Sequence, residues 1–240
     1  MMINILKKIL PHKYKREIKE KLGVPSFHWS LENLKNKKFN PGMVLDIGAY
    51  EGYWTMDLLE VFPDAKVFMI EAQKGKAPFL EKVKTIYQQT EYSIALLSSV
   101  DNEFKDFYEN ETSSHVIKEP SQDKSSCKIQ TITLDSLLEE KKIAFPDFLK
   151  LDVQGHELEV LKGAEKSLAN SEVCLLEVSL LDFGDRLPLL AEVVSFMDNK
   201  NFQAYDISQF IRRPFDKALF QIDMFFVKKD SPIIASKRWD

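Results

Sequence analysis

The 240-residue sequence has few cysteines and no long apolar run, and each shortage argues against a class of protein. Its two cysteines, Cys127 and Cys174, lie far apart and lack the spacing of metal ligands. This usage favours a reducing compartment and inert core thiols over a disulfide framework or a zinc site. No apolar run approaches the roughly eighteen residues that a membrane-spanning helix needs. The apolar stretch before Lys7 and Lys8 is too short for a signal peptide, so we expect a cytoplasmic protein.

Basic residues do not balance the acids outside the N-terminal region. Residues 1–40 contain ten Lys or Arg and three Asp or Glu, a surplus of +7. Because the whole chain has a net charge of −4, the other two hundred residues carry −11. A nucleic-acid-binding cleft should be basic, so this acidic body argues against a nucleic-acid partner.

The N-terminal region has two amphipathic stretches, at residues 3–10 and 13–22, and Gly23 and Pro25 then signal a helix end. We favour a helical pair that packs on its own domain. The alternative is peripheral contact of residues 1–22 with an anionic membrane surface, at the inner face of the membrane, or with a lipid-linked phosphate.

Short apolar runs alternate with amphipathic stretches after residue 40, which indicates an α/β fold whose strands are buried on both faces. No repeat marks a further boundary, so we expect a basic helical extension at 1–40, one α/β domain at 41–230 and a tail at 231–240. Residues 101–133 are more polar and predict antiparallel strands inserted near the cleft. The expected strands are 43–47, 66–70, 92–96, 148–151, 173–178, 202–207 and 221–227, and the expected helices are 53–62, 78–89, 135–141, 157–169 and 187–199.

The first motif places an acid and a glycine-bearing turn at the ends of two neighbouring strands. Residues 44–52, with the sequence VLDIGAYEG, predict a buried strand, a turn and a helix start, and Glu71 ends the next strand. Ligands of open α/β sheets lie at the carboxyl ends of the strands. Glu71 could accept both hydroxyls of a ribose there, so the motif predicts a nucleoside-bearing ligand.

The glycine spacing separates two such ligands. A dinucleotide site needs G-x-G-x-x-G, whereas Tyr50 stands where the second glycine would admit the pyrophosphate. S-adenosylmethionine carries no phosphate but a positive sulfonium, which suits a carboxylate such as Asp46 beside the loop. The spacing therefore favours S-adenosylmethionine, and a nicotinamide-dependent oxidoreductase is the minor alternative.

The second motif gathers acids and a histidine at the ends of two later strands. Asp152 ends one strand, His156 and Glu157 begin the following helix, and Glu177 ends the next strand. Adjacent strands stand about 4.8 Å apart, so Asp152 and Glu177 could face one cleft. The four residues suit removal of a hydroxyl proton, and Asp152 and Glu177 equally suit a divalent cation.

Each of these four residues has a structural alternative. For Asp152 and Glu177 we favour a functional role over a structural one. A carboxylate at the end of a buried strand costs free energy unless it has a binding partner or a catalytic role. Glu157 could serve only as a favourable acid at a helix N-terminus, and His156 could be a solvated turn residue. Both interpretations stay open for these two residues.

Four segments together resemble the FkbM-type S-adenosylmethionine-dependent methyltransferases: DIGAYEG at 46–52, TITLD at 131–135, KLDVQGHE at 150–157 with its VLKGA tail, and LEV at 176–178. The resemblance covers roughly residues 41–228. It implies the class I methyltransferase (Rossmann-like) fold, with a seven-stranded and mostly parallel sheet, an antiparallel last strand and helices on both faces. The N-terminal helices lie outside the resemblance.

The resemblance also implies O-methylation, of sugars in surface glycans or of polyketide-type metabolites. By position, the expected cofactor-binding residues are Asp46, Gly48, Tyr50, Gly52, Thr55, Glu71, Ala72, Ser93, Ala95 and Asp152. Two positions depart from the family, which usually has Asn in place of Tyr50 and Glu in place of Gln154. Tyr50 can still turn an aromatic face to the sulfonium, whereas Gln154 removes an acid from any metal site.

We therefore expect an S-adenosylmethionine-dependent O-methyltransferase of polysaccharide or glycolipid assembly, with Asp152, His156, Glu157 and Glu177 as catalytic candidates. A small metabolite as the methyl acceptor is the alternative within this activity. A cofactor-binding module without catalysis is the alternative outside it.

Overall fold

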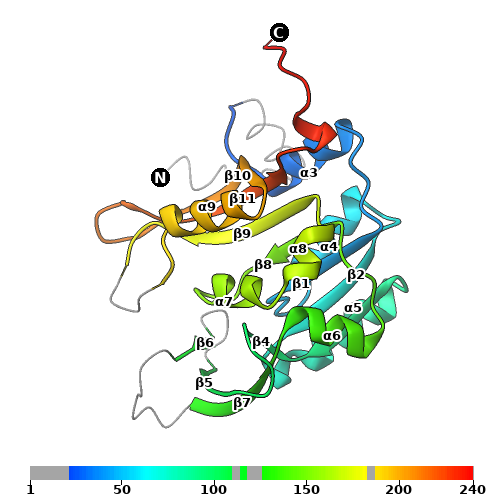
Figure 1. The fold of residues 1–240 in the computed structure, drawn as a ribbon, viewed down its shortest axis with the longest axis vertical. Coiled ribbons are helices and arrows are strands. Elements are labelled where there is room, and N and C mark those ends of the chain that lie inside the picture. Colours follow the sequence, from blue (N-terminus) through cyan, green and yellow to red (C-terminus); the bar gives the residue numbers. More distant parts are fainter. Residues whose placement is uncertain (1–21, 110–113, 118–125, 183–186, 240) are drawn as a thin grey trace, which may run out of the picture.

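The computed structural model describes residues 22–109, 114–117, 126–182 and 187–239, which form a large sheet with helices on both faces and a small second sheet (Figure 1). The large sheet has seven strands in the order β10-β11-β9-β8-β1-β2-β3. β11 is antiparallel to both neighbours, and the pairs among β9, β8, β1, β2 and β3 are parallel. The expected sheet is thus confirmed. Its strands are β1 (Met43–Ile47), β2 (Lys66–Glu71), β3 (Thr90–Ile94), β8 (Phe148–Leu151), β9 (Val173–Ser179), β10 (Phe202–Arg212) and β11 (Leu219–Lys228).

Alternation along the strands decides which helices pack on which face of the large sheet. Val44 and Leu45 of β1 point to opposite faces, and each joins a separate buried cluster. The Val44 side is covered by α3 (Phe27–Asn36), α4 (Tyr53–Val61) and α5 (Ala77–Ile86). The Leu45 side is covered by α6 (Leu134–Lys141), α7 (Glu157–Lys162), α8 (Glu165–Asn170) and α9 (Leu190–Asn199). Because helices cover both faces, central strands such as β8 are buried at every position.

The helix α3 is not among the expected helices. Its Leu31 and Leu34 are fully buried, and the helix lies against α4 and β10. Phe27, Leu31 and Leu34 have helical spacing, so the sequence did contain this signal. The hydrophobic core therefore includes residues that precede position 41.

The single helix expected at 157–169 is wrong, because the chain forms α7 and α8 instead. The break falls at Gly163, where an added Cβ would lie 2.4 Å from the carbonyl oxygen of Ser98. Asp135 of α6 then accepts hydrogen bonds from the backbone N–H groups of Lys166 and Ser167, at 2.7 and 3.0 Å. α8 therefore has its own N-terminal cap, supplied by another helix.

The segment after β3 leaves the large sheet and forms the small one, with the order β4-β7-β5-β6. The strand expected at 92–96 consequently ends earlier, at Ile94. β5 is antiparallel to β6 and to β7, which confirms the expected antiparallel insertion. Phe107 and Val116 bury against Ala72, just after β2, so the insertion lies beside the carboxyl edge of the large sheet. The strands are β4 (Leu96–Leu97), β5 (Phe104–Tyr108), β6 (His115–Val116) and β7 (Ser126–Ile132).

The two chain ends differ in what can be described. The expected helices at 3–10 and 13–22 lie outside the described residues, except for Leu22. Near the other end, the short 3-10 helix η3 (Pro232–Ile234) buries Ile233 in the core on the Val44 side. In the described part of the chain, every helix is too short or too polar to cross a bilayer.

Candidate active site

The carboxyl ends of β1, β2, β8 and β9 border a pocket of about 480 Å³, within the size range of small-molecule sites. The pocket is lined by eight of the expected site residues: Gly48, Tyr50, Glu71, Ala72, Ala95, Asp152, His156 and Glu177. Five others lie outside the lining: Asp46, Gly52, Thr55, Ser93 and Glu157. The two sequence motifs thus meet across one pocket.

The turn after β1 requires glycine at Gly48. Its φ is +73°, and an added Cβ would lie 1.7 Å from the backbone oxygen of Asp152. Its N–H donates to the carbonyl of Ile70 at 2.9 Å, which fixes the turn against β2. The turns after β1 and β8 are therefore in direct backbone contact, and no side chain larger than hydrogen fits between them.

Glu71 is held rigidly at the end of β2. It is 5% exposed, and its two carboxylate oxygens accept hydrogen bonds from the backbone N–H groups of Tyr50 and Gln73, each at 2.8 Å. Each oxygen retains a further lone pair, and the residue lines the pocket. A ligand with two adjacent hydroxyls would find two fixed acceptors here.

Tyr50 has a neighbour that sequence reasoning missed. The Lys76 ammonium lies 3.8 Å from the centre of the Tyr50 ring and 3.0 Å from the carboxylate of Glu51. Tyr50 also adopts a positive φ of 50° in the turn. A cation of the protein therefore already occupies one face of the ring that was expected to meet a sulfonium.

Asp46 does not present its carboxylate to the pocket. It is fully buried, accepts a 2.7 Å hydrogen bond from the Thr55 hydroxyl and lies 2.9 Å from the Lys150 ammonium. Asp46 and Thr55, both expected at the cofactor, form a buried pair beneath the turn, and their side chains do not reach the pocket lining. Lys150 was present in the second motif, but its partner lies 104 positions away.

Asp152 and Glu177 face the same pocket, and Gln154 joins them. The Gln154 amide nitrogen donates to Asp152 at 3.0 Å and to Glu177 at 2.8 Å. Burial, followed by the charge of Asp152, raises the pKa of Glu177 well above its usual value. Asp223, paired with Glu177 across β9 and β11, has its pKa raised to about 6, chiefly by burial. Glu177 and Asp223 therefore hold protons more tightly than ordinary carboxylates do.

Glu157 and His156 are adjacent in the sequence, but only His156 lines the pocket. The Glu157 carboxylate accepts the backbone N–H groups of Val153 and Gly155, at 3.0 and 3.1 Å, and burial raises its pKa to about 7. It anchors the turn before α7 and lies outside the pocket lining. His156 does line the pocket, with its Nε2 3.1 Å from the Ser98 hydroxyl, and it is 5% exposed rather than a solvated turn residue.

Two further expected residues lie away from the pocket. An added Cβ at Gly52, whose φ is +78°, would lie 2.8 Å from a methyl carbon of Val83 on α5. Ser93 sits within β3, opposite Ile70 of β2. Gly52 therefore lets α4 begin close to α5, and neither residue reaches the pocket lining.

An apolar wall closes the outer part of the pocket. It consists of Phe107 and Val116 from the small sheet and of Ile211 and Phe220 from the β10–β11 hairpin. None of these four residues was expected at the site. Their sequence pattern indicates strands, but it contains no signal that places those strands over the pocket.

The described residues contain no group of three or more His, Cys, Asp and Glu side chains arranged to hold a metal ion. The expected pair of metal ligands, Asp152 and Glu177, is joined by an amide donor instead. The Gln154 side chain therefore occupies the position between the two carboxylates.

Comparison with known proteins gives a family and a fold. A family model described as the methyltransferase FkbM domain matches residues 46–204. The hexuronic acid methyltransferase AglP of Haloferax volcanii is 40% identical over 68 residues, which is 28% of each chain. The curated relative is therefore matched over less than a third of its length.

Two solved structures share the fold. Methyltransferase FkbM from Methylobacillus flagellatus superposes with a TM-score of 0.51 and 17% identity, over 76% of this chain and 43% of that one. An O-methyltransferase described as putative, from Klebsiella pneumoniae, superposes with a TM-score of 0.51 and 12% identity, over 94% of both chains. Such identities establish the class I methyltransferase fold alone. Because the family model covers most of the chain, including both motifs, the protein belongs to the FkbM methyltransferase family.

Proposed function

We propose that the protein is an S-adenosylmethionine-dependent O-methyltransferase that acts on a sugar hydroxyl. The observation that supports this most directly is one pocket that contains Glu71 at the end of β2 together with Asp152 and Glu177 beside β8 and β9. When bound, this cofactor supplies an electrophilic methyl group on a cationic sulfur. Acids at separate strand ends suit a ligand with a ribose at one end and positive charge at the other.

Three residues would hold the cofactor. Glu71, oriented by two backbone N–H groups, would accept the ribose hydroxyls. Gly48 lets the turn after β1 lie directly against the backbone of Asp152, which places this turn at the pocket where the ligand would bind. Asp152 would accept from the ammonium of the amino-acid end, because Gln154 donates to only one of its two carboxylate oxygens.

Glu177 is the best base among the pocket residues. The acceptor hydroxyl would give its proton to Glu177 as the oxygen bonds to the methyl carbon, with the carbon–sulfur electron pair left on sulfur. The pKa of Glu177 is raised toward neutral pH, and a general base is most effective when its pKa lies near the working pH. Gln154 holds its carboxyl group in place. His156 is a weaker candidate because its ring is already tied to Ser98.

A sugar is the favoured acceptor for two reasons. The relative that is 40% identical over part of the chain is described as a hexuronic acid methyltransferase. The outer pocket also presents the rings of Phe107 and Phe220, and aromatic rings pack well against the C–H face of a sugar. Polysaccharide or glycolipid assembly is the process that such an activity would serve.

A small apolar metabolite is the second candidate. The apolar wall of Phe107, Val116, Ile211 and Phe220 would fit a polyketide-type acceptor equally well by its hydrophobicity. The two acceptors differ in the polar contacts that they need. A panel that contains both classes separates them.

Calorimetry with S-adenosylhomocysteine and NAD in parallel tests the cofactor. We expect saturable binding of the former and none of the latter; the reverse pattern would overturn the proposal. Conversion of the methyl donor is then followed with free sugars, uronic acids, glycolipids and aromatic metabolites, with and without a chelator. Turnover with a sugar class alone supports the favoured acceptor, and turnover with metabolites alone replaces it by the second candidate.

A further inference from the structure

Exposed apolar side chains gather on the β10–β11 hairpin. Ile207, Phe210, Ile211 and Phe215 are 38%, 43%, 40% and 90% exposed, and they lie within nine consecutive positions. They make up four of the twelve large hydrophobic side chains that are exposed in the described part of the chain. A concentration of exposed apolar side chains on one hairpin is typical of an interaction surface.

Basic side chains accompany this apolar cluster. The Arg212 guanidinium lies 5.7 Å from the centre of the Phe210 ring, and that of Arg213 lies 5.7 Å from the Phe215 ring. Residues 207–217 contain three basic residues and one acid, a net charge of +2, whereas residues 41–240 together carry −11. The hairpin tip is thus a basic and aromatic point on an otherwise acidic domain.

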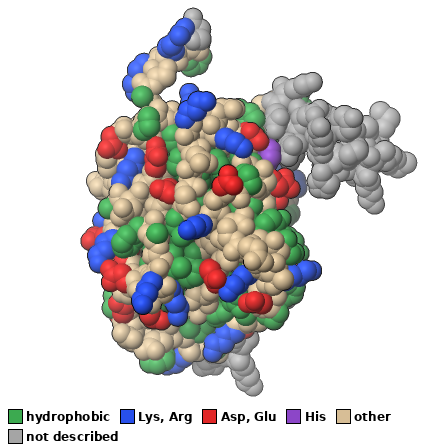
Figure 2. Space-filling view, turned by 90° about the vertical axis from the view of Figure 1, so that its right-hand side faces the viewer, with side chains coloured by type: hydrophobic (Ala, Val, Ile, Leu, Met, Phe, Trp, Pro, Cys, Tyr) green, Lys and Arg blue, Asp and Glu red, His purple; other side chains and the backbone are tan. Residues whose placement is uncertain are grey.

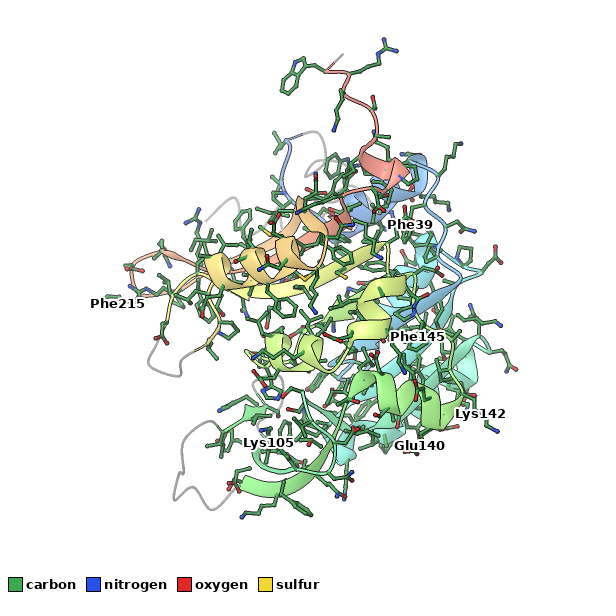
Figure 3. The ribbon with its side chains drawn as sticks, in the orientation of Figure 1. Phe39, Lys105, Glu140, Lys142, Phe145 and Phe215 are labelled. Atoms are coloured by element: carbon green, nitrogen blue, oxygen red, sulfur yellow. The ribbon has the colours of Figure 1, made fainter. Side chains whose placement is uncertain are left out.

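The tip is an ordered turn. Asp216 accepts hydrogen bonds from Arg213 at 2.6 Å and from the backbone N–H of Ala218 at 2.9 Å. Arg212 donates to the carbonyl of Lys217 at 3.0 Å. These contacts hold Phe215 outward at the end of the hairpin, beyond the rest of the sheet (Figure 3). Because the turn is already fixed, insertion of the Phe215 ring into a binding partner or a lipid surface would cost little conformational entropy.

The opposite side of the molecule has a different surface. Figure 2 shows the side that faces right in Figure 1, away from the hairpin tip, and acidic and basic side chains are mixed across it. The hairpin also has a place at the pocket, because Ile211 and Phe220 line it. Ile211 directly precedes Arg212 of the tip, so a surface that holds the tip would lie next to the pocket opening.

We propose that the β10–β11 hairpin tip docks on an anionic lipid bilayer, with Phe215 inserted among the headgroups and Arg212, Arg213 and Lys217 facing lipid phosphates. Aromatic side chains flanked by Lys and Arg are the usual composition of such interfacial anchors. A second copy of the chain would gain the apolar contacts but would oppose like charges. Docking would bring a lipid-linked acceptor to the pocket, and this last consequence alone rests on the proposed function.

A fluorescent label at the tip tests the docking. In the full chain with Cys127→Ser, which removes the exposed thiol and leaves the buried Cys174, Phe215→Cys carries an environment-sensitive dye. We expect a blue shift with phosphatidylcholine vesicles that contain phosphatidylglycerol, and none with phosphatidylcholine alone. The matched control, Phe104→Cys, labels a side chain that is 67% exposed on the small sheet and should not respond. Equal responses at both positions, or none at Phe215, overturn the proposal.

Vesicle sedimentation supplies an independent measurement. Phe215→Ser should weaken binding of the full chain to the anionic vesicles by roughly tenfold, the effect of one buried aromatic ring. Unchanged binding would assign the membrane contact to another segment, such as residues 1–21, and reject the hairpin. A dimer without vesicles that Phe215→Ser dissociates would identify a second copy as the occupant. These vesicle experiments contain no cofactor and no methyl acceptor. A negative result would therefore reject membrane docking without bearing on the proposed methyltransferase activity.

Discussion

The Lys150 ammonium lies 2.9 Å from the Asp46 carboxylate, and the two side chains are 6% and 0% exposed. The same ammonium donates to the carbonyls of Ile47 and Gly48, at 3.3 and 3.0 Å, and lies 4.0 Å from Asp152. Burial alone would lower the pKa of Lys150, but the charges of Asp46 and Asp152 outweigh it and raise that pKa. One buried cation therefore links the turns after β1 and β8 beneath the pocket.

Lys150→Met should destabilise the protein by about 3–5 kcal/mol, because it leaves the Asp46 carboxylate buried without its cation. The free energy of unfolding in urea measures the loss. The matched variant Asp46→Asn/Lys150→Met removes both charges and should recover part of the stability. Equal destabilisation in the single and double variants would mean that the ion pair is not the cause.

Gly48→Ala should lower both stability and affinity for S-adenosylhomocysteine. The new Cβ would overlap a backbone oxygen of Asp152, and the positive φ adds roughly 1 kcal/mol of strain. Calorimetry and thermal unfolding give the two readouts. Gly75→Ala is the control, since it makes the same chemical change where nothing lies within 4 Å of the Cβ position and the φ is not positive. Similar behaviour of both variants would contradict a special role for the turn.

Glu71→Gln should weaken S-adenosylhomocysteine binding by roughly 10- to 100-fold, the range for hydrogen bonds to a charged group. The amide can accept through one atom only, whereas Glu71 offers two acceptors that are fixed by Tyr50 and Gln73. Glu51→Gln, in the same turn but outside the pocket lining, should bind the ligand normally. If both variants bind normally, the ribose does not lie against Glu71.

Glu177→Gln should reduce turnover by about 10²–10⁴ while affinity for S-adenosylhomocysteine stays within a few fold, because only proton removal is lost. His156→Ala gives the comparison: its turnover should fall less if Glu177 is the base. Steady-state kinetics with an accepted sugar measure both variants. The reverse order of effects would transfer the role of base to His156.

The pH dependence of stability should reveal Glu157. Burial raises its pKa to about 7, so the folded protein binds this proton more tightly than the unfolded chain does. The resulting stabilisation is complete below the unfolded pKa, near 4.5, and is lost as pH rises through about 7. The difference in unfolding free energy between wild type and Glu157→Gln should change by about 3 kcal/mol across this interval. A constant difference would show that Glu157 has an ordinary pKa.

Local patterns in the sequence predicted most of the large sheet. Strands such as β1 and β8 are short apolar runs that end in a polar turn, and both have the expected bounds. Gly48, Glu71, Asp152 and Glu177 reach the pocket because the carboxyl ends of parallel strands share one edge. Periodicity and strand polarity were sufficient for these features.

Features that depend on distant partners could not be predicted in the same way. Asp46 has the sequence position of a pocket acid, but Lys150 neutralises it from 104 positions away. The apolar wall comes from the insertion and from the last hairpin, whose approach to the pocket no local pattern encodes. The break at Gly163 likewise depends on the carbonyl of Ser98 from another segment.

The contact between Gly48 and the Asp152 carbonyl restricts the relative motion of the turns after β1 and β8. Because the two turns touch through their main chains, and Lys150 fastens them from below, neither can swing away alone. We expect any movement that admits or releases a ligand to involve other lining segments, such as Val116 from the short strand β6 and Ile211 from the edge strand β10. The part of the pocket between these two turns would therefore stay rigid. The part lined by Val116 and Ile211 would move when the methyl donor binds and when its demethylated product leaves.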